Sequence, residues 1–478
     1  MPSDSAASGN QFGRLLFPGG PKRPPVLPPV QLALVSLALA CAAALLGYVN
    51  GTPEDAALAA FVALLGAYMA ANIGANDVAN SVAPLVGARV LPLGAALLLA
   101  AGAEVAGALF AGDQIVGRIA FRIVDPDLVR DPAGFVYGMA AALTGAALWV
   151  NAANLLRAPI STTHAIIGGI VGVGLFALGA SAINWPEIAA ITLGWFVSPV
   201  ASALAAIAIL AFVKRELLGV QDKLRAARTW IPILIATMAA LFVLFLIKKG
   251  LANVWQPAMP VLVTTVLAAF AATMALAGPY IRRTSMGLAN KGQTVRVLFR
   301  VPLIAAGGFI AFAHGANDIA NIAGPVTAIL HVQATSDLDL APGIPFWVFL
   351  LGALGIAAGL LLFGGGMVRL VATRITKINP IRAYAVAMAT AATVTAASWI
   401  GLPVSTTQIA VGAIFGIGIY RELRAQKDRA AKAIQTQKRP RRLFRRGDML
   451  RILIAWTITF PASALISGLL YWIISLSE

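Results

Sequence analysis

Residues 74–80 read GANDVAN and residues 315–321 read GANDIAN, and each copy lies within a long apolar run. Each motif places one aspartate between two asparagines, in a stretch that is otherwise apolar enough to cross a lipid bilayer. An ionisable side chain at that depth is costly, so such residues mark functional sites in membrane proteins. The duplicated motif therefore predicts a polar site inside a membrane, built from two parts of the chain.

The composition of the whole chain fits this setting. Of the 478 residues, 59% are hydrophobic and 12% are charged, which is about half the charged share of a soluble domain. Apolar runs of about 18 or more residues, the length that crosses a bilayer as a helix, recur along the chain. The net charge of +17 comes from basic residues clustered in loops between these runs, as in membrane proteins. We expect an all-α polytopic membrane protein that contacts lipid and no nucleic acid.

The charges of the loops predict the orientation, because loops rich in Lys and Arg stay on the cytoplasmic side. We expect three basic loops in the cytoplasm, namely 214–228, 282–300 and 421–446. We expect three loops without Lys or Arg outside, namely 51–55, 178–189 and 331–343. This orientation puts the N-terminus in the cytoplasm and the C-terminus outside, in the cell (inner) membrane. Lys248 and Lys249 disagree with it, since they fall on the predicted outer side.

Two apolar stretches do not behave as simple spans. Transmembrane helices are predicted near 31–49, 56–86, 91–121, 187–213, 230–248, 256–281, 301–328, 345–370 and 448–475. The stretches 134–178 and 382–420 each begin and end on the same side of the membrane. Such a segment is a re-entrant hairpin, whose turn must be buried in protein because lipid cannot bond its backbone. The polar turns read RAPISTTHA at 157–165 and GLPVSTTQI at 401–409.

The same ordered features occur twice. Asp77 precedes Ser161 by 84 positions and Asp318 precedes Ser405 by 87. The second copy approaches its hairpin from the opposite side, so we expect two inverted-topology repeats, each with a re-entrant helical hairpin. This is the plan of secondary transporters, which bind substrate at the repeat interface. The expected parts are a disordered cytoplasmic tail (1–30), an extra transmembrane helix (31–55), a first repeat (56–213), linking helices with basic cytoplasmic loops (214–300) and a second repeat (301–475) containing the basic cytoplasmic loop 421–446.

The two hairpin turns predict an anion site. In each turn a proline precedes an STT triplet by one residue, and a Gly-rich helix follows. Ser or Thr caps a helix start, where free backbone N–H groups and the helix dipole attract anions.

The aspartates and asparagines predict a cation site beside it. Carboxylate, amide and hydroxyl oxygens suit a hard cation, whereas thiolate or imidazole suits a transition metal. Two buried carboxylates and an oxyanion require compensating cations, so the sequence predicts that anion and cation move together.

The duplicated GANDVAN/GANDIAN and the paired STT turns resemble the inorganic phosphate transporter (PiT) family over about residues 56–475. The resemblance implies an inverted-repeat fold, import of phosphate by symport with sodium or protons, no further cofactor and often a homodimer. By motif position, phosphate binding falls on Ser161, Thr162, Thr163, Ser405, Thr406 and Thr407. Cation binding falls on Asn76, Asp77, Asn80, Asn317, Asp318 and Asn321, with Na⁺ at Asp77 and Asp318.

Other polar residues break the symmetry. Ser81 follows the first motif, whereas Ile322 follows the second, and His164 of the first turn corresponds to Gln408 of the second. The possible accessory ligands are Ser81, Glu104, His164 and Gln408. His314 is interpreted as a packed, hydrogen-bonded histidine. Asn151 and Asn154 are expected to bond across helices.

Alternatives remain open at this point. An intramembrane aspartyl protease also has two membrane aspartates, but it leaves the asparagines and STT turns unexplained, so we expect no enzyme. Within transporters, proton coupling and sulfate as substrate are the alternatives. Sodium is favoured because both aspartates have asparagines at the same offsets.

Overall fold

The computed structural model describes residues 53–125, 128–129, 131–252, 254–335, 344–374, 379–432 and 446–476. The predicted tail at 1–30, the helix at 31–49 and the acidic residues of the loop at 331–343 lie outside the described residues. Within them the chain is almost entirely helical, with nine helical segments long and apolar enough to cross a membrane. The predicted all-α membrane fold is confirmed.

The first half of the chain forms one long helix, a broken helix, a hairpin and a further long helix. These are α3 (Pro53–Gly87), α4 (Leu93–Ala111), α5 (Asp113–Phe121), α6 (Pro132–Leu156), α7 (Thr162–Ala177) and α8 (Trp185–Val213). The helix expected at 91–121 is broken at Gly112, where a Cβ would run into the side chain of Ile319. The expected hairpin at 134–178 forms as α6 and α7.

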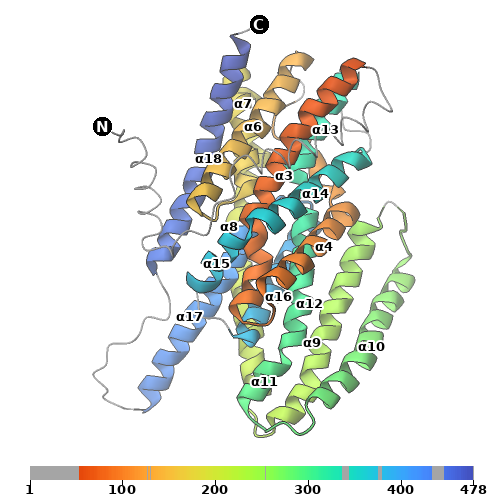
Figure 1. Cartoon of the computed structure of the whole chain (residues 1–478), viewed down its shortest axis with the longest axis vertical. Helices are drawn as coiled ribbons and strands as arrows, with labels where there is room; N and C mark the ends of the chain where they lie inside the picture. Colours follow the sequence, from red (N-terminus) through yellow and green to blue (C-terminus); the bar gives the residue numbers. More distant parts are fainter. Residues whose placement is uncertain are drawn as a thin grey trace.

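The middle of the chain forms α9 (Lys223–Phe245), α10 (Met259–Thr284) and the short α11 (Gly292–Leu298). Two π-helical turns, η3 (Lys214–Leu218) and η4 (Leu246–Gly250), extend α8 and α9. The helices α9 and α10 pack on each other along one edge of the bundle (Figure 1). The Asp113 carboxylate interacts electrostatically with Lys249. Lys248 and Lys249 still disagree with the predicted orientation.

The second half repeats the order of the first. It comprises α12 (Arg300–Asp318), α13 (Ala320–Thr335), α14 (Phe346–Phe363), α15 (Gly365–Arg374), α16 (Pro380–Trp399), α17 (Thr406–Lys432) and α18 (Arg446–Ser475). Here the helix breaks at the motif itself, after Asp318, whereas α3 runs unbroken through Asp77. The helix α17 continues to Lys432, so the start of the predicted loop 421–446 is helical; its Ala, Arg, Lys and Glu residues are good helix formers.

The contacts between the two halves are reciprocal. The helix α3 packs on α14 and α12 packs on α4; likewise α7 packs on α18 and α17 on α8. Small residues let these backbones approach closely: a Cβ on Gly74 would overlap the carbonyl of Ile356, and one on Gly315 would overlap that of Glu104. A two-fold relation between the halves requires such reciprocity.

The two hairpins lie toward opposite ends of the long axis, α6–α7 in the upper part of Figure 1 and α16–α17 in the lower part. This placement agrees with repeats that enter the membrane from opposite sides. The inverted relation itself stays a prediction, and it depends on the orientation of the chain.

A labelling experiment tests that orientation. Cys41 is the single cysteine of the sequence and is replaced by alanine. In this background we expect a cysteine introduced as Leu476→Cys to react with an impermeant maleimide added outside intact cells. Leu476 is 67% exposed at the end of α18, so access to the reagent depends only on the side of the membrane. Met286→Cys, in the basic loop 282–300, is the matched control and should react only after permeabilisation. Reaction of Leu476→Cys only after permeabilisation would overturn the orientation.

Candidate functional site

Each hairpin turn ends in a serine that caps the next helix. The Ser161 hydroxyl accepts a hydrogen bond from the His164 backbone N–H at 3.1 Å, and Ser405 accepts one from Gln408 N–H at 3.2 Å. Both STT triplets are buried. The caps leave further backbone N–H groups of the first turn at each helix start, so each turn has the structure that the sequence predicts for an anion site.

Asp77 joins the two hairpins. Thr162 Oγ1, from the first turn, donates to Asp77 Oδ2 at 2.8 Å. Thr407 Oγ1, from the second turn, donates to Asp77 Oδ1 at 2.9 Å. The carboxylate is buried in the middle of α3, so the first motif and both hairpin turns meet at one place.

The last asparagine of each motif reaches the hairpin of the other repeat. Asn80 Nδ2 donates to Thr407 Oγ1 at 2.9 Å and to Thr406 Oγ1 at 3.4 Å. Asn321 Nδ2 donates to Thr163 Oγ1 at 3.3 Å. These reciprocal contacts place the predicted anion and cation residues against each other.

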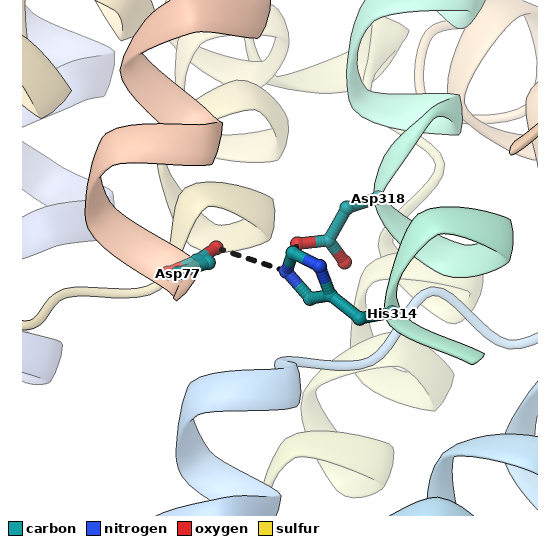
Figure 2. A group of neighbouring side chains, drawn as sticks. All are labelled: Asp77, His314 and Asp318. Atoms are coloured by element: carbon teal, nitrogen blue, oxygen red, sulfur yellow. Dashed lines mark ion pairs between the residues drawn. The ribbon is translucent and has the colours of Figure 1, made fainter. Parts of the chain in front are cut away.

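A histidine and three carboxylates form the centre of the site. His314 lies next to Asp77, from α3, and Asp318, from its own helix α12 (Figure 2). Its Nε2 is 2.9 Å from Asp318 Oδ2 and 3.9 Å from Asp77 Oδ2, and its Nδ1 is 3.2 Å from Glu104 Oε1. All four side chains are about 1% exposed or less. The charges therefore interact without screening by solvent.

This centre fits a cation. The ligand atoms of Asp77, His314 and Asp318 all lie within 4.8 Å of one another. Two buried oxygens, Glu104 Oε2 and Asn317 Oδ1, make no hydrogen bond within the described part of the chain, and the partner of Asp318 Oδ2 is His314 Nε2. Buried polar oxygens without a donor are costly, and a hard cation would satisfy carboxylate and amide oxygens together.

The first asparagines of the two motifs differ in what they bind. Asn76 Nδ2 donates to Asn154 Oδ1 at 2.8 Å and to Ala158 O at 3.2 Å, and its Oδ1 accepts from Ile160 N–H at 3.2 Å. Both ends of this amide thus hold the first hairpin turn. Asn317 Nδ2 donates to Asp318 Oδ1 at 2.6 Å and to Val404 O of the second hairpin turn at 3.0 Å. Its Oδ1 has no donor within the described residues, so this oxygen is left for a ligand.

The accessory residues fall into two groups. Ser81 Oγ donates to Glu104 Oε1 at 3.4 Å, so both belong to the carboxylate cluster. His164 lies in the first turn of α7, after the capping Ser161, and its ring centroid is 3.8 Å from that of Trp195. Gln408 takes the equivalent place in the second turn and is also buried.

Sequence reasoning was right about part of the remaining polar residues. Asn151 and Asn154 do bond across helices, each donating to Asn72 Oδ1, at 3.0 and 3.2 Å. The interpretation of His314 as a packed histidine is right about its burial but missed its three carboxylate neighbours. The available signal was its place four residues before Asp318, which puts both side chains on one helix face.

Comparisons with known proteins agree on one family. The model of the phosphate transporter family matches residues 73–467. A Helicobacter pylori (strain J99) protein named as a candidate phosphate permease is 37% identical over 407 residues, which cover 84% of this chain and 76% of that protein. A similarly named protein of Pyrococcus abyssi is 33% identical over 417 residues, covering 86% and 97%. A solved structure described as the sodium-dependent phosphate transporter superposes with a TM-score of 0.79 at 32% identity, covering 87% of this chain and 99% of that one. With its duplicated motif, its paired serine-capped turns and these matches, the chain belongs to the phosphate transporter family.

Proposed function

We propose that the chain imports inorganic phosphate by symport with a cation, sodium being favoured, through alternating access. The observation that carries this proposal is the double contact of Asp77 with Thr162 and Thr407. One carboxylate of the cation motif thereby bonds to both anion-binding turns, so binding of phosphate changes the surroundings of the cation, and the reverse. The similar sodium-dependent phosphate transporter supports the same assignment.

The charges of the site explain why the two ions would travel together. Asp77, Glu104 and Asp318 surround a single histidine. A phosphate brought to the adjacent STT turns adds negative charge to a region that already has an excess of carboxylates. Cations bound between the carboxylates offset that repulsion, so phosphate binds well only when they are present.

Phosphate itself would be held by the two turns. Ser161, Thr162 and Thr163 from one side and Ser405, Thr406 and Thr407 from the other supply hydroxyls, and the starts of α7 and α17 supply N–H groups. Helix N-termini suit phosphate through their dipole and their free donors. We further propose that the protein works as a homodimer in the cell membrane, with its N-terminus in the cytoplasm.

A protease site of two aspartates is not supported by the geometry. Such a dyad needs the two carboxyl groups close enough to share one proton. Here each carboxylate has partners of its own: Asp77 accepts from Thr162 and Thr407, and Asp318 Oδ2 lies 2.9 Å from His314 Nε2. The arrangement therefore favours ion binding over hydrolysis.

Competition between anions tests the substrate. Purified protein in liposomes should take up radiolabelled phosphate with saturation, and arsenate should block this uptake because it has the same shape and charge. The measurement is the initial rate at a fixed phosphate concentration with increasing arsenate or sulfate. If sulfate competes better than arsenate, the phosphate assignment is wrong. Protein-free liposomes give the background.

A further inference from the structure

An ion-paired arginine contacts the turn of the second hairpin. Arg118, on α5, donates from Nη1 to the carbonyl oxygen of Gly401 at 3.2 Å. Its Nε lies 3.3 Å from Oε1 of Glu187, in the first turn of α8. The Arg118 and Glu187 side chains are only 24% and 14% exposed. One side chain thus connects α5, α8 and the α16–α17 turn.

The contacted carbonyl belongs to the segment that leads into the anion site. Gly401 follows α16 in the left-handed conformation, with φ of 67°. The N–H groups of Gly401 and Leu402 bond back to Ser398 and Ala397, which closes the helix end. Ser405, the cap of α17, comes four residues after Gly401. The position of the turn at Gly401 therefore affects where the second STT triplet lies.

The first hairpin turn is held in a different way. Asn154 Nδ2 donates to the carbonyl oxygen of Asn72 at 3.0 Å, and Asn76 Nδ2 donates to Asn154 and to Ala158 O. These uncharged amides belong to α3 and to the first hairpin, and they bond one another in the interior. Releasing this turn would break several bonds at once and leave their partners unsatisfied.

Within the described residues, the second hairpin lacks asparagine counterparts of Asn72, Asn151 and Asn154. Aligned on the aspartates and the STT triplets, the counterparts of Asn72, Asn151 and Asn154 are Ala313, Thr395 and Ser398. Within the described residues, Thr395 Oγ1 and Ser398 Oγ have no hydrogen-bond partner. The backbone of the second turn is tied instead by Asn317 and Thr163, which both donate to Val404 O, and by Arg118.

We propose that Arg118, oriented by Glu187, is a positioning residue that latches the second hairpin turn in its closed position. Releasing this latch would open the site toward the end of the molecule where α8 begins, the predicted outer side. The bond from Arg118 to Gly401 O lies in partly hydrated surroundings, so it opens more readily than the buried bonds of Asn317 and Thr163 to Val404 O or the buried amides of the first turn. The Gly401 end of the second turn is therefore the part that moves first. Its part in transport rests on the proposed function, whereas the latch itself does not.

The rate of cysteine modification measures the latch directly. Leu402→Cys, in a Cys41→Ala background, places a thiol beside Gly401, where the native side chain is half-buried. In purified full-length protein in detergent, Arg118→Gln should speed its reaction with a water-soluble maleimide about tenfold, the change expected for loss of one charge-assisted bond. Arg118→Lys should give an intermediate rate, because an ammonium retains the charge but cannot span Gly401 and Glu187 together.

Two controls separate the latch from general loosening. Arg122→Gln, an exposed arginine at the end of the same helix, should leave the rate at Leu402→Cys unchanged. Ala158→Cys, the corresponding position of the first turn, should react equally fast with and without Arg118→Gln. Equal rates at Leu402→Cys in the Arg118→Gln and Arg122→Gln proteins would overturn the latch, as would equal acceleration at both turns. If Arg118→Gln does not fold, the maleimide reaction rate of Leu402→Cys in the Arg118→Lys protein decides: a rate equal to that with Arg118 would overturn the latch. Failure of phosphate uptake would instead reject the proposed function and leave this result standing.

Discussion

Asp77→Asn should abolish phosphate uptake, lowering the initial rate by at least about a hundredfold, because two charge-assisted hydrogen bonds of about 1.5–3 kcal/mol each meet on this carboxylate. Thr162 donates to one of its oxygens and Thr407 to the other. An asparagine has a single acceptor oxygen, and its amide group would face a hydroxyl as a second donor. It also removes one of the negative charges that attract the cation. The measurement is phosphate uptake into liposomes containing equal amounts of wild-type and variant protein.

The matched control is Asp222→Asn. Asp222 caps α9 by accepting from the Arg225 N–H at 2.9 Å, outside the candidate site. Asparagine caps a helix as well as aspartate does, so this variant should transport at the wild-type rate. Size-exclusion profiles of the three proteins show whether the Asp77→Asn chain is folded. A folded Asp77→Asn protein that transports normally would refute the role given to Asp77.

The duplicated motifs made much of this site predictable. Residues next to one another in sequence, such as Asn76 and Asp77, identify a local chemistry, and the second copy shows that it is not accidental. The caps at Ser161 and Ser405 follow from short-range rules, and the structure has both. The meeting of both turns at Asp77 is what the predicted inverted arrangement would produce, although the sequence does not say which threonine reaches which oxygen.

Features that depend on tertiary packing could not be predicted. Glu104 comes from α4 and His314 from α12, and they meet because Gly107 and Gly315 let these two backbones approach closely. The sequence shows no carboxylate counterpart for Glu104. In the structure, the backbone of Ile356 packs against Gly74 as the backbone of Glu104 packs against Gly315, so the counterpart is an isoleucine. The pairing of Arg118 with Gly401 likewise joins different repeats. No periodicity or spacing connects such residues.

The two motifs also turned out to be less alike than their sequences. The helix is continuous through Asp77 but breaks after Asp318. A histidine contacts Asp318 closely, while two threonines bond Asp77. The asymmetry arises from residues outside the motif, because position 314 is histidine where the first repeat has Ile73. Motifs that differ only at Val78 and Ile319 therefore need not bind identical ions.

The amide oxygens give the strongest reason to expect sodium at the second motif. Asn317 Oδ1 is buried without a hydrogen-bond donor in the described structure, next to Asp318, whose Oδ2 lies 2.9 Å from His314 Nε2. A proton carrier needs only a carboxylate or an imidazole, whereas sodium must replace its water ligands with several protein oxygens. In the first motif the Asn76 amide is already used by the hairpin turn. Asn317→Ala should therefore raise the sodium concentration for half-maximal uptake, and Asn76→Ala should change it much less.

Removing sodium should reduce phosphate uptake to the rate of protein-free liposomes, even when an inward proton gradient is imposed. The reason is electrostatic: without a cation between Asp77 and Asp318, phosphate at the STT turns meets uncompensated carboxylates in a region that excludes water. A proton gradient alone does not supply a cation that these carboxylate and amide oxygens can coordinate together. The experiment replaces external sodium with choline at constant ionic strength and measures initial uptake at an outside pH below the inside pH. A sodium gradient without a pH difference is the positive control. Full-rate accumulation driven by protons alone would contradict sodium coupling, and would make the carboxylates and His314 proton carriers instead.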